Sequence, residues 1–198
     1  MPCVNNSFMT FLNTFFLTDL YSGSPVEKVD IARRLYAVFF DQLPQIPQLS
    51  STLITLQHHA MNLNVHMQSM GLGQLCSRCA AGPGGGCCSA YMADNCDVIQ
   101  ILLNLLMDVR VTFDTKSTVS CGFLGPSGCL FHIKPIFCLN YNCTHILRGA
   151  ASQDLSVLYR FANTVLSGQT DAEAMLLSAL PDLIKNGLIS EDGLKSGT

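Results

Sequence analysis

The sequence is poor in charge, and it lacks both a basic cluster and a long uninterrupted apolar run. Charged residues make up 13% of its 198 residues and hydrophobic residues 48%, a balance that argues against a disordered chain. With a net charge of −3 and no Lys/Arg cluster, we expect no nucleic-acid partner, because such binding depends on neutralising phosphates. The strongest apolar stretch, residues 98–107, contains Gln100 and Asn104 and is too short for a membrane span.

The N-terminus is apolar but has no basic segment, so it does not read as a signal peptide, and we expect a cytoplasmic protein. Ten cysteines could in principle form five disulfides. However, the chain is long enough to stabilise a core without them, and all but Cys3 fall between residues 76 and 143. Such clustering in a cytosolic chain points to metal binding or catalysis rather than to disulfides.

The pattern predicts a single domain, 1–198, in three parts. Residues 1–72 form a helical N-terminal part, 73–146 a cysteine-cluster metal-binding region, and 147–198 a pair of C-terminal helices. In the first part, residues 8–16 show helical spacing of apolar side chains. A second helix begins with the capping box of Ser24 and Glu27, and a third begins near Ser50 or Ser51.

One helix, from about residue 95 to 108, interrupts the cysteine region, and Asp94 and Asp97 are its expected caps. In the third part, a helix beginning at Ser152 should end at Gly168. Thr170 to Glu173 then has the form of a capping box that opens a further helix. The expected fold class is mainly α, with helices flanking a loop-rich, cysteine-ligated metal-binding centre.

Eight cysteines fall in two loops that contain Gly and Pro, and we expect these eight to be the metal ligands: Cys76, Cys79, Cys87, Cys88, Cys121, Cys129, Cys138 and Cys143. Thiolates are soft ligands that suit zinc, Cu(I) and iron–sulfur clusters. The C-x2-C spacing recurs in zinc knuckles and iron–sulfur loops, where a tight turn brings two sulfurs to one side. Glycines between Cys79 and Cys87 would let the backbone bend towards an ion. The alternatives are that these cysteines form disulfides or remain free thiols.

This spacing resembles the YkgJ-type cysteine-cluster family, which is described as a zinc- or iron-chelating domain. Its first element is a C-x2-C motif followed closely by a CC pair, here Cys76, Cys79, Cys87 and Cys88. Its second element here comprises Cys121-Gly122-Phe123-Leu124, Gly128-Cys129, Lys134-Pro135, and Cys138 through Tyr141 to Cys143. The match covers about the central third of the chain. Seven residues precede the CC pair where the family usually has two, and Lys134 stands where the family usually has Arg.

The resemblance implies bound zinc or iron, the iron as ions or as an iron–sulfur cluster. Three function classes stay open: a metal-binding protein of structural or accessory role, a metal-dependent enzyme resembling a protein-lysine methylase, and a thiol-redox or metal-handling protein. Whether both Cys87 and Cys88 ligate is open, as are the substrate, the protein partner and the oligomeric state. Cys96 reads as a small buried hydrophobe, Cys3 as unliganded, and His132 as an ordinary loop residue that could serve as a spare ligand.

Overall fold

The computed structural model describes residues 17–82, 86–116, 119–140 and 143–195, and it is mainly helical, as expected. The helix expected at residues 8–16 and Cys3 lie outside the described residues. Within these ranges no helix is long and apolar enough to cross a membrane. The helices and strands, in chain order, are η1 Leu17–Leu20, α2 Pro25–Val38, η2 Leu43–Gln45, α3 Leu49–Ser69, α4 Leu72–Ala80, α5 Ala90–Asp94, α6 Val98–Leu106, β1 Leu124–Gly125, β2 Gly128–Cys129, α7 Ile136–Asn140, α8 Thr144–Gly149 and α9 Ser152–Lys195.

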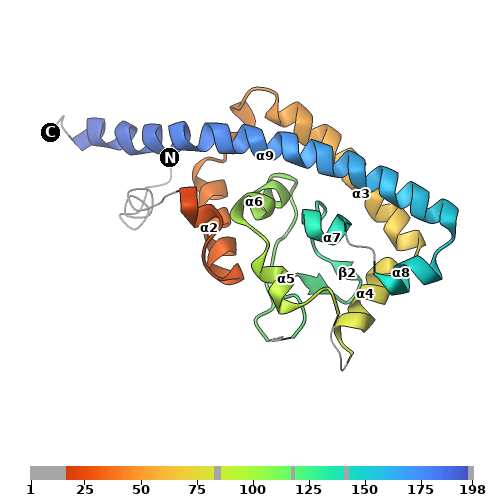
Figure 1. Cartoon of the computed structure of the whole chain (residues 1–198). Helices are drawn as coiled ribbons and strands as arrows, with labels where there is room; N and C mark the ends of the chain where they lie inside the picture. The colour runs from red at the N-terminus through yellow and green to blue at the C-terminus, as the bar shows by residue number, and fades with distance from the viewer. Residues whose placement is uncertain (1–16, 83–85, 117–118, 141–142, 196–198) are drawn as a thin grey trace.

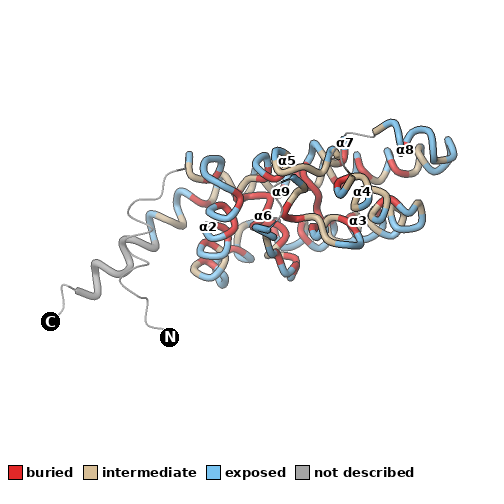
Figure 2. The backbone as a smooth tube through the Cα atoms, turned by 90° about the horizontal axis from the view of Figure 1, so that it is seen from below, coloured by how far each residue is buried: buried red, intermediate tan, exposed pale blue. Residues whose placement is uncertain are grey.

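Two long helices, α3 and α9, lie side by side along the molecule, and the cysteine-bearing elements lie below them in Figure 1. α3 buries Leu53, Leu56, Ala60 and Leu63, which are three and four residues apart and so share one face. Between Leu158 and Leu180, α9 buries one residue about every three or four, the spacing that turns one face of a helix towards a core. In Figure 2 the buried positions gather between the helices and the exposed positions face outward.

The two C-terminal helices expected from the sequence are one continuous helix, so the predicted stop at Gly168 is wrong. Gly168 lies where α9 crosses α3, and a Cβ atom there would lie 3.2 Å from Cδ1 of Leu56. Thr170 does not cap a new helix, because its hydroxyl donates to the carbonyl of Leu166 one turn earlier. The side chain of Glu173 instead accepts a hydrogen bond from Gln169. Both signals therefore reflect packing and side-chain bonds inside one helix.

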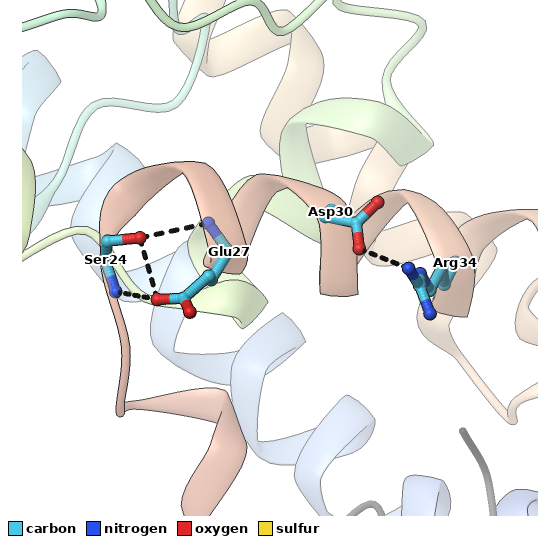
Figure 3. Close-up of polar contacts among 4 residues, drawn as sticks. All are labelled: Ser24, Glu27, Asp30 and Arg34. Carbon is cyan, nitrogen blue, oxygen red and sulfur yellow. Dashed lines mark hydrogen bonds and ion pairs between the residues drawn. The ribbon is translucent and has the colours of Figure 1, made fainter. Parts of the chain in front are cut away.

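Helix α2 begins as predicted, with the capping box of Ser24 and Glu27 (Figure 3). The Ser24 Oγ accepts from the Glu27 backbone N–H, and the Glu27 carboxylate accepts from the Ser24 backbone N–H at 2.7 Å. One turn further on, Asp30 and Arg34 form an exposed ion pair, also drawn in Figure 3. The buried side of α2 packs against α6. Arg33 of α2 also donates to the carbonyl of Val111, which follows α6 in the chain.

Helix α6 is the central helix, shorter than expected and almost entirely buried. Asp97 caps it as predicted by accepting from the Gln100 backbone N–H at 2.7 Å. Asp94 is not a cap of this helix, because it ends the separate short helix α5. The carbonyl of Asp94 accepts a hydrogen bond from the buried Lys28 ammonium of α2. We call α2, α3, α6 and α9 the helical frame.

Candidate functional site: a cluster of cysteines

Cys76 and Cys79 lie on a helix, α4, and not in the glycine-rich loop expected from the sequence. Gly71, with a φ of 68°, turns the chain between α3 and α4, a conformation that glycine adopts without strain. The helix then buries Leu72 and Ala80. Because residues three apart on a helix share a face, the two thiols of the C-x2-C motif lie on the same side of α4.

Two glycines hold α4 against the hairpin formed by β1 and β2, whose strands pair antiparallel. A Cβ atom on Gly73 would lie 2.1 Å from the carbonyl oxygen of Ser127, so no larger residue fits there without movement. Opposite it, Gly128 has a φ of 115°, and a Cβ there would lie 2.8 Å from the Cα of Gly73. The Ser77 hydroxyl also donates to the carbonyl of Gly125 at 2.8 Å. This close contact brings Cys76 of α4 near Cys129 of the hairpin.

The segment with the CC pair is tied to both neighbouring cysteine segments. A Cβ atom on Gly86 would lie 3.1 Å from the sulfur of Cys79, so the chain passes directly beside α4. On the other side, the Cys121 backbone N–H donates to the carbonyl of Cys88 at 3.0 Å. A bridge between Ser89 and Ser120 continues this pairing. Residues that are far apart in sequence are therefore joined through main-chain hydrogen bonds. We call α4, residues 86–90, residues 119–140 and α8 the cysteine region.

Asn104 of α6, which is fully buried, holds the segment between Cys129 and Cys138 in place. Its Oδ1 accepts from the backbone N–H groups of His132 and Ile133, at 2.9 and 3.1 Å, and its Nδ2 donates to the carbonyl of Ile133. Gln100, one turn earlier, donates to the same carbonyl at 2.6 Å. These two positioning residues were noted in the sequence only as interruptions of an apolar run. Polar side chains inside a buried helix need hydrogen-bond partners, so their presence in an apolar run could have predicted the positioning role of these two residues.

The eight sequence-predicted ligand cysteines are neighbours pair by pair, because their thiols alter one another's pKa values. Besides burial, Cys129, Cys121 and Cys87 raise the pKa of Cys138, and Cys76, Cys143 and Cys79 raise that of Cys87. Cys88 interacts most strongly with Cys76. Within the described ranges none of the cysteines forms a disulfide. Most are half-buried, Cys87 is exposed, and Cys143 stands at the N-terminus of α8. Four segments of the chain thus contribute thiols to one cluster.

Most thiols of this cluster are held protonated. Burial, followed by the charges of neighbouring cysteines, raises the pKa of Cys138 to about 12. Burial also raises the pKa of Cys121 to about 11 and that of Cys129 above its usual range. A buried lysine faces the cluster: Lys134 donates to Asn64 Oδ1 and to the Phe131 carbonyl, and burial lowers its pKa. With so little positive charge nearby, the cluster cannot carry many thiolates by itself.

Cys76 is the exception. The hydrogen bond from Cys88 and, less strongly, the charge of Lys134 lower the pKa of Cys76 to about 7, against the opposing effect of burial. The pKa of Cys88 is raised, because its proton is held in that same hydrogen bond. Of these two neighbouring thiols, Cys76 is therefore the easier one to ionise.

The donor set has the number and softness of ligands that zinc, iron or an iron–sulfur cluster would need. Within the part of the chain that the structure describes, however, no three His, Cys, Asp or Glu side chains are arranged to hold one metal ion. Cys96 is buried, 3% exposed, as the sequence indicated. His132 is exposed and contributes its backbone groups to Asn104 and Asn64.

Comparison with known proteins adds no relative: no family model, no curated sequence and no solved structure matches this chain. The class of this protein is therefore described only by its fold and its cysteine cluster. The chain is a mainly helical protein that gathers eight free cysteines from four segments beside a buried lysine.

Proposed function

We propose that this protein binds zinc or iron through its cysteine cluster, the iron as ions or as an iron–sulfur cluster. The observation that carries the proposal is that thiols from α4, residues 86–90, residues 119–140 and the N-terminus of α8 are neighbours and form no disulfide. The resemblance of the cysteine spacing to the YkgJ-type family points the same way. The proposed ligands are Cys76, Cys79, Cys87, Cys88, Cys121, Cys129, Cys138 and Cys143.

A bound cation would remove an electrostatic conflict in the cluster. Burial and neighbouring sulfurs raise most of the thiol pKa values, so several thiolates cannot coexist there without added positive charge. Metal ions bind cysteine as thiolate and release the proton, so the cost of ionisation is offset by coordination. Among the described residues no three of these side chains surround one point, so binding would draw the segments of the cysteine region closer together.

The test is metal and acid-labile sulfide analysis, with a visible spectrum, on protein purified without oxygen. Iron with sulfide and a brown colour would make the cluster an iron–sulfur site, whereas colourless protein with stoichiometric zinc would make it a zinc site. Cys129→Ser and Cys138→Ser should each lower the bound metal, while Cys96→Ala, a buried cysteine outside the pattern, should leave it unchanged. Metal-free protein with paired cysteines, or equal metal in all variants, would overturn the proposal.

A second candidate function, thiol–disulfide exchange, is favoured by the nearness of Cys88 to Cys76 and by the pKa of Cys76, which Cys88 lowers to about 7. The Cys76 thiolate would attack one sulfur of a disulfide substrate and release one thiolate of it. Cys88 would then attack Cys76, forming an internal disulfide and releasing the second thiol, so that one disulfide replaces another. The C-x2-C partner Cys79 is not needed for this reaction.

Glutathione disulfide and mass spectrometry on metal-free protein test this second candidate. Wild-type protein should form a reversible Cys76–Cys88 disulfide, and Cys88→Ser should stop at a mixed disulfide of glutathione with Cys76. Random modification across the cysteines, with no trapped species at Cys76, would exclude it.

A further inference from the structure

A pocket of about 130 Å³ lies between α6, α7 and α9, apart from the cysteine sulfurs. α6 contributes Gln100 and its capping residue Asp97, and α7 contributes Ile136 and Phe137. α9 contributes a run of residues that includes Leu166, Gln169 and Glu173. Residues three and four apart on a helix share a face, so these α9 side chains point the same way. A cavity of 150 Å³ holds benzene, so this pocket suits a ligand of about five non-hydrogen atoms.

The polar residues of the pocket offer oxygen atoms to a ligand, because the side-chain amides of Gln169 and Gln100 already donate hydrogen bonds within the protein. Gln169 Nε2 donates to Gln100 Oε1 at 2.5 Å and to Glu173 Oε1 at 3.0 Å, and Gln100 Nε2 donates to the Ile133 carbonyl. Gln169 is only 4% exposed, yet its Oε1 accepts no hydrogen bond. A buried acceptor without a donor costs free energy, and a ligand that donates to it would recover that cost.

The charges facing the pocket leave room for one more cation. Burial raises the pKa of both Asp97 and Glu173, and burial followed by the charges of these two carboxylates raises the pKa of Tyr21. Lys28, whose ammonium donates to the carbonyl of Asp94 at 2.6 Å, is the cation that acts on Asp97 among the described residues. When both carboxylates are ionised, these three described groups carry a net charge of −1 in a partly desolvated place.

The lining of the pocket also includes apolar side chains. These are Pro135, Ile136, Leu166 and Phe137 of α7, which is 55% exposed. An alkyl chain would be buried against these side chains, and a cation there would also meet the face of an aromatic ring favourably.

We propose that this pocket binds a small alkylammonium ion, with its ammonium group held by Glu173, Asp97 and the unpartnered Oε1 of Gln169 and its alkyl chain against Ile136, Phe137 and Leu166. An ammonium group has three N–H donors and no acceptor, which matches a pocket with three acceptors whose own donors are occupied. This inference does not depend on the metal proposal, because none of the residues that line the pocket is a proposed metal ligand.

The experiment is an NMR titration of the ¹⁵N-labelled full chain with n-butylammonium chloride at pH 7, with 1-butanol and sodium chloride as matched controls. We expect saturable shifts at the side-chain amides of Gln100 and Gln169 and along residues 166–173, with a dissociation constant of about 1 mM for so small a ligand. Glu173→Gln keeps an acceptor for Gln169 but removes the charge, and it should weaken binding about tenfold. Asp171→Asn, an exposed carboxylate two residues away on α9, should not.

Equal binding of 1-butanol would overturn the proposal, because the pocket would then recognise only the alkyl chain. Absence of saturable shifts at these residues would also overturn it, as would unchanged binding in Glu173→Gln. To detect a folding defect in the variant, its dispersion of backbone signals is compared with that of wild-type protein. If the variant is not folded, Leu166→Ala and Phe137→Ala decide instead: each should weaken butylammonium, and normal affinity in both would contradict the proposal.

Discussion

In the helical frame, α3 and α9 meet along buried leucine, alanine and valine side chains, whereas the cysteine region is held largely by hydrogen bonds and close backbone contacts. An aromatic group, in which Phe123 packs on Phe113 and Phe131, lies beside the cysteines, and Ile133, Leu139 and Ile146 join the common core. The stabilisation from apolar burial is roughly proportional to the area buried, so we expect the frame to have the larger intrinsic stability. We therefore expect the frame to keep its fold without a ligand and the cysteine region to depend more on what its thiols bind.

Removal of the proposed metal should separate the two regions most strongly. In excess chelator, amides of α4 and the hairpin should exchange with solvent about a hundredfold faster, because coordination no longer links their segments. Amides in the middle of α3 and α9 should keep their protection. Hydrogen exchange followed by mass spectrometry measures both in one sample. Uniform loss of protection in all helices, or none anywhere, would contradict the division into two regions.

Asn104→Ala should be the most damaging single substitution in the connection between the regions. It removes the acceptor of the His132 and Ile133 N–H groups and leaves buried donors unpaired. We expect a loss of about 3 kcal/mol, or roughly 6–12 °C in Tm for a chain of this length. Asn62→Ala, at an exposed position of α3, is the matched control and should change Tm little. Thermal unfolding followed by circular dichroism provides the measurement, and an equal drop in both variants would contradict this role.

Gly73→Ala tests the contact between α4 and the hairpin. The added methyl group would meet the Ser127 carbonyl at 2.1 Å, so α4 or the hairpin must move. We expect a cost of about 2 kcal/mol by thermal unfolding, together with lower metal content, since Cys76 would be displaced from Cys129. Gly149→Ala is the control, because nothing lies within 4 Å of a Cβ atom there. Identical stability and metal content in the two variants would show that the close contact is unimportant.

Local signals in the sequence were sufficient where local interactions decide the structure. The capping box of Ser24 and Glu27 and the cap at Asp97 depend on neighbouring residues, and both are confirmed. Gly168 and Thr170 carried equally strong local signals for a break in α9. There the packing against Leu56 and the continuing hydrogen-bond ladder prevail, since tertiary contacts override weak helix propensities.

The spacing of the cysteines predicts which of them are ligands, but it could not predict how their segments are arranged. The close approach of Gly73 to Gly128 and the hydrogen bond from the Cys121 N–H to the Cys88 carbonyl join positions far apart in sequence. The pocket beside Glu173 was not foreseen at all, because Asp97, Phe137 and Gln169 come from separate helices that show no common motif.

Glu173→Gln should give the smallest effect, and it is specific to one pH range. Burial, with a smaller contribution from Asp97, holds the pKa of Glu173 above its ordinary value, against the opposing hydrogen bond from Gln169. Between the unfolded and folded pKa values the native state binds more protons than the unfolded state, so stability falls as pH rises through this range.

Glutamine does not titrate, so the variant lacks this decline. Its Tm relative to wild type should therefore increase from pH 4 to pH 8, by about 2 °C, the size expected for a change of under about 1 kcal/mol. Asp171→Asn, on the exposed side of α9, controls for the loss of one negative charge from the helix. A Tm difference that stays constant with pH would mean that water reaches the Glu173 carboxylate freely, and the pocket would then lack the desolvation on which its attraction for a cation depends.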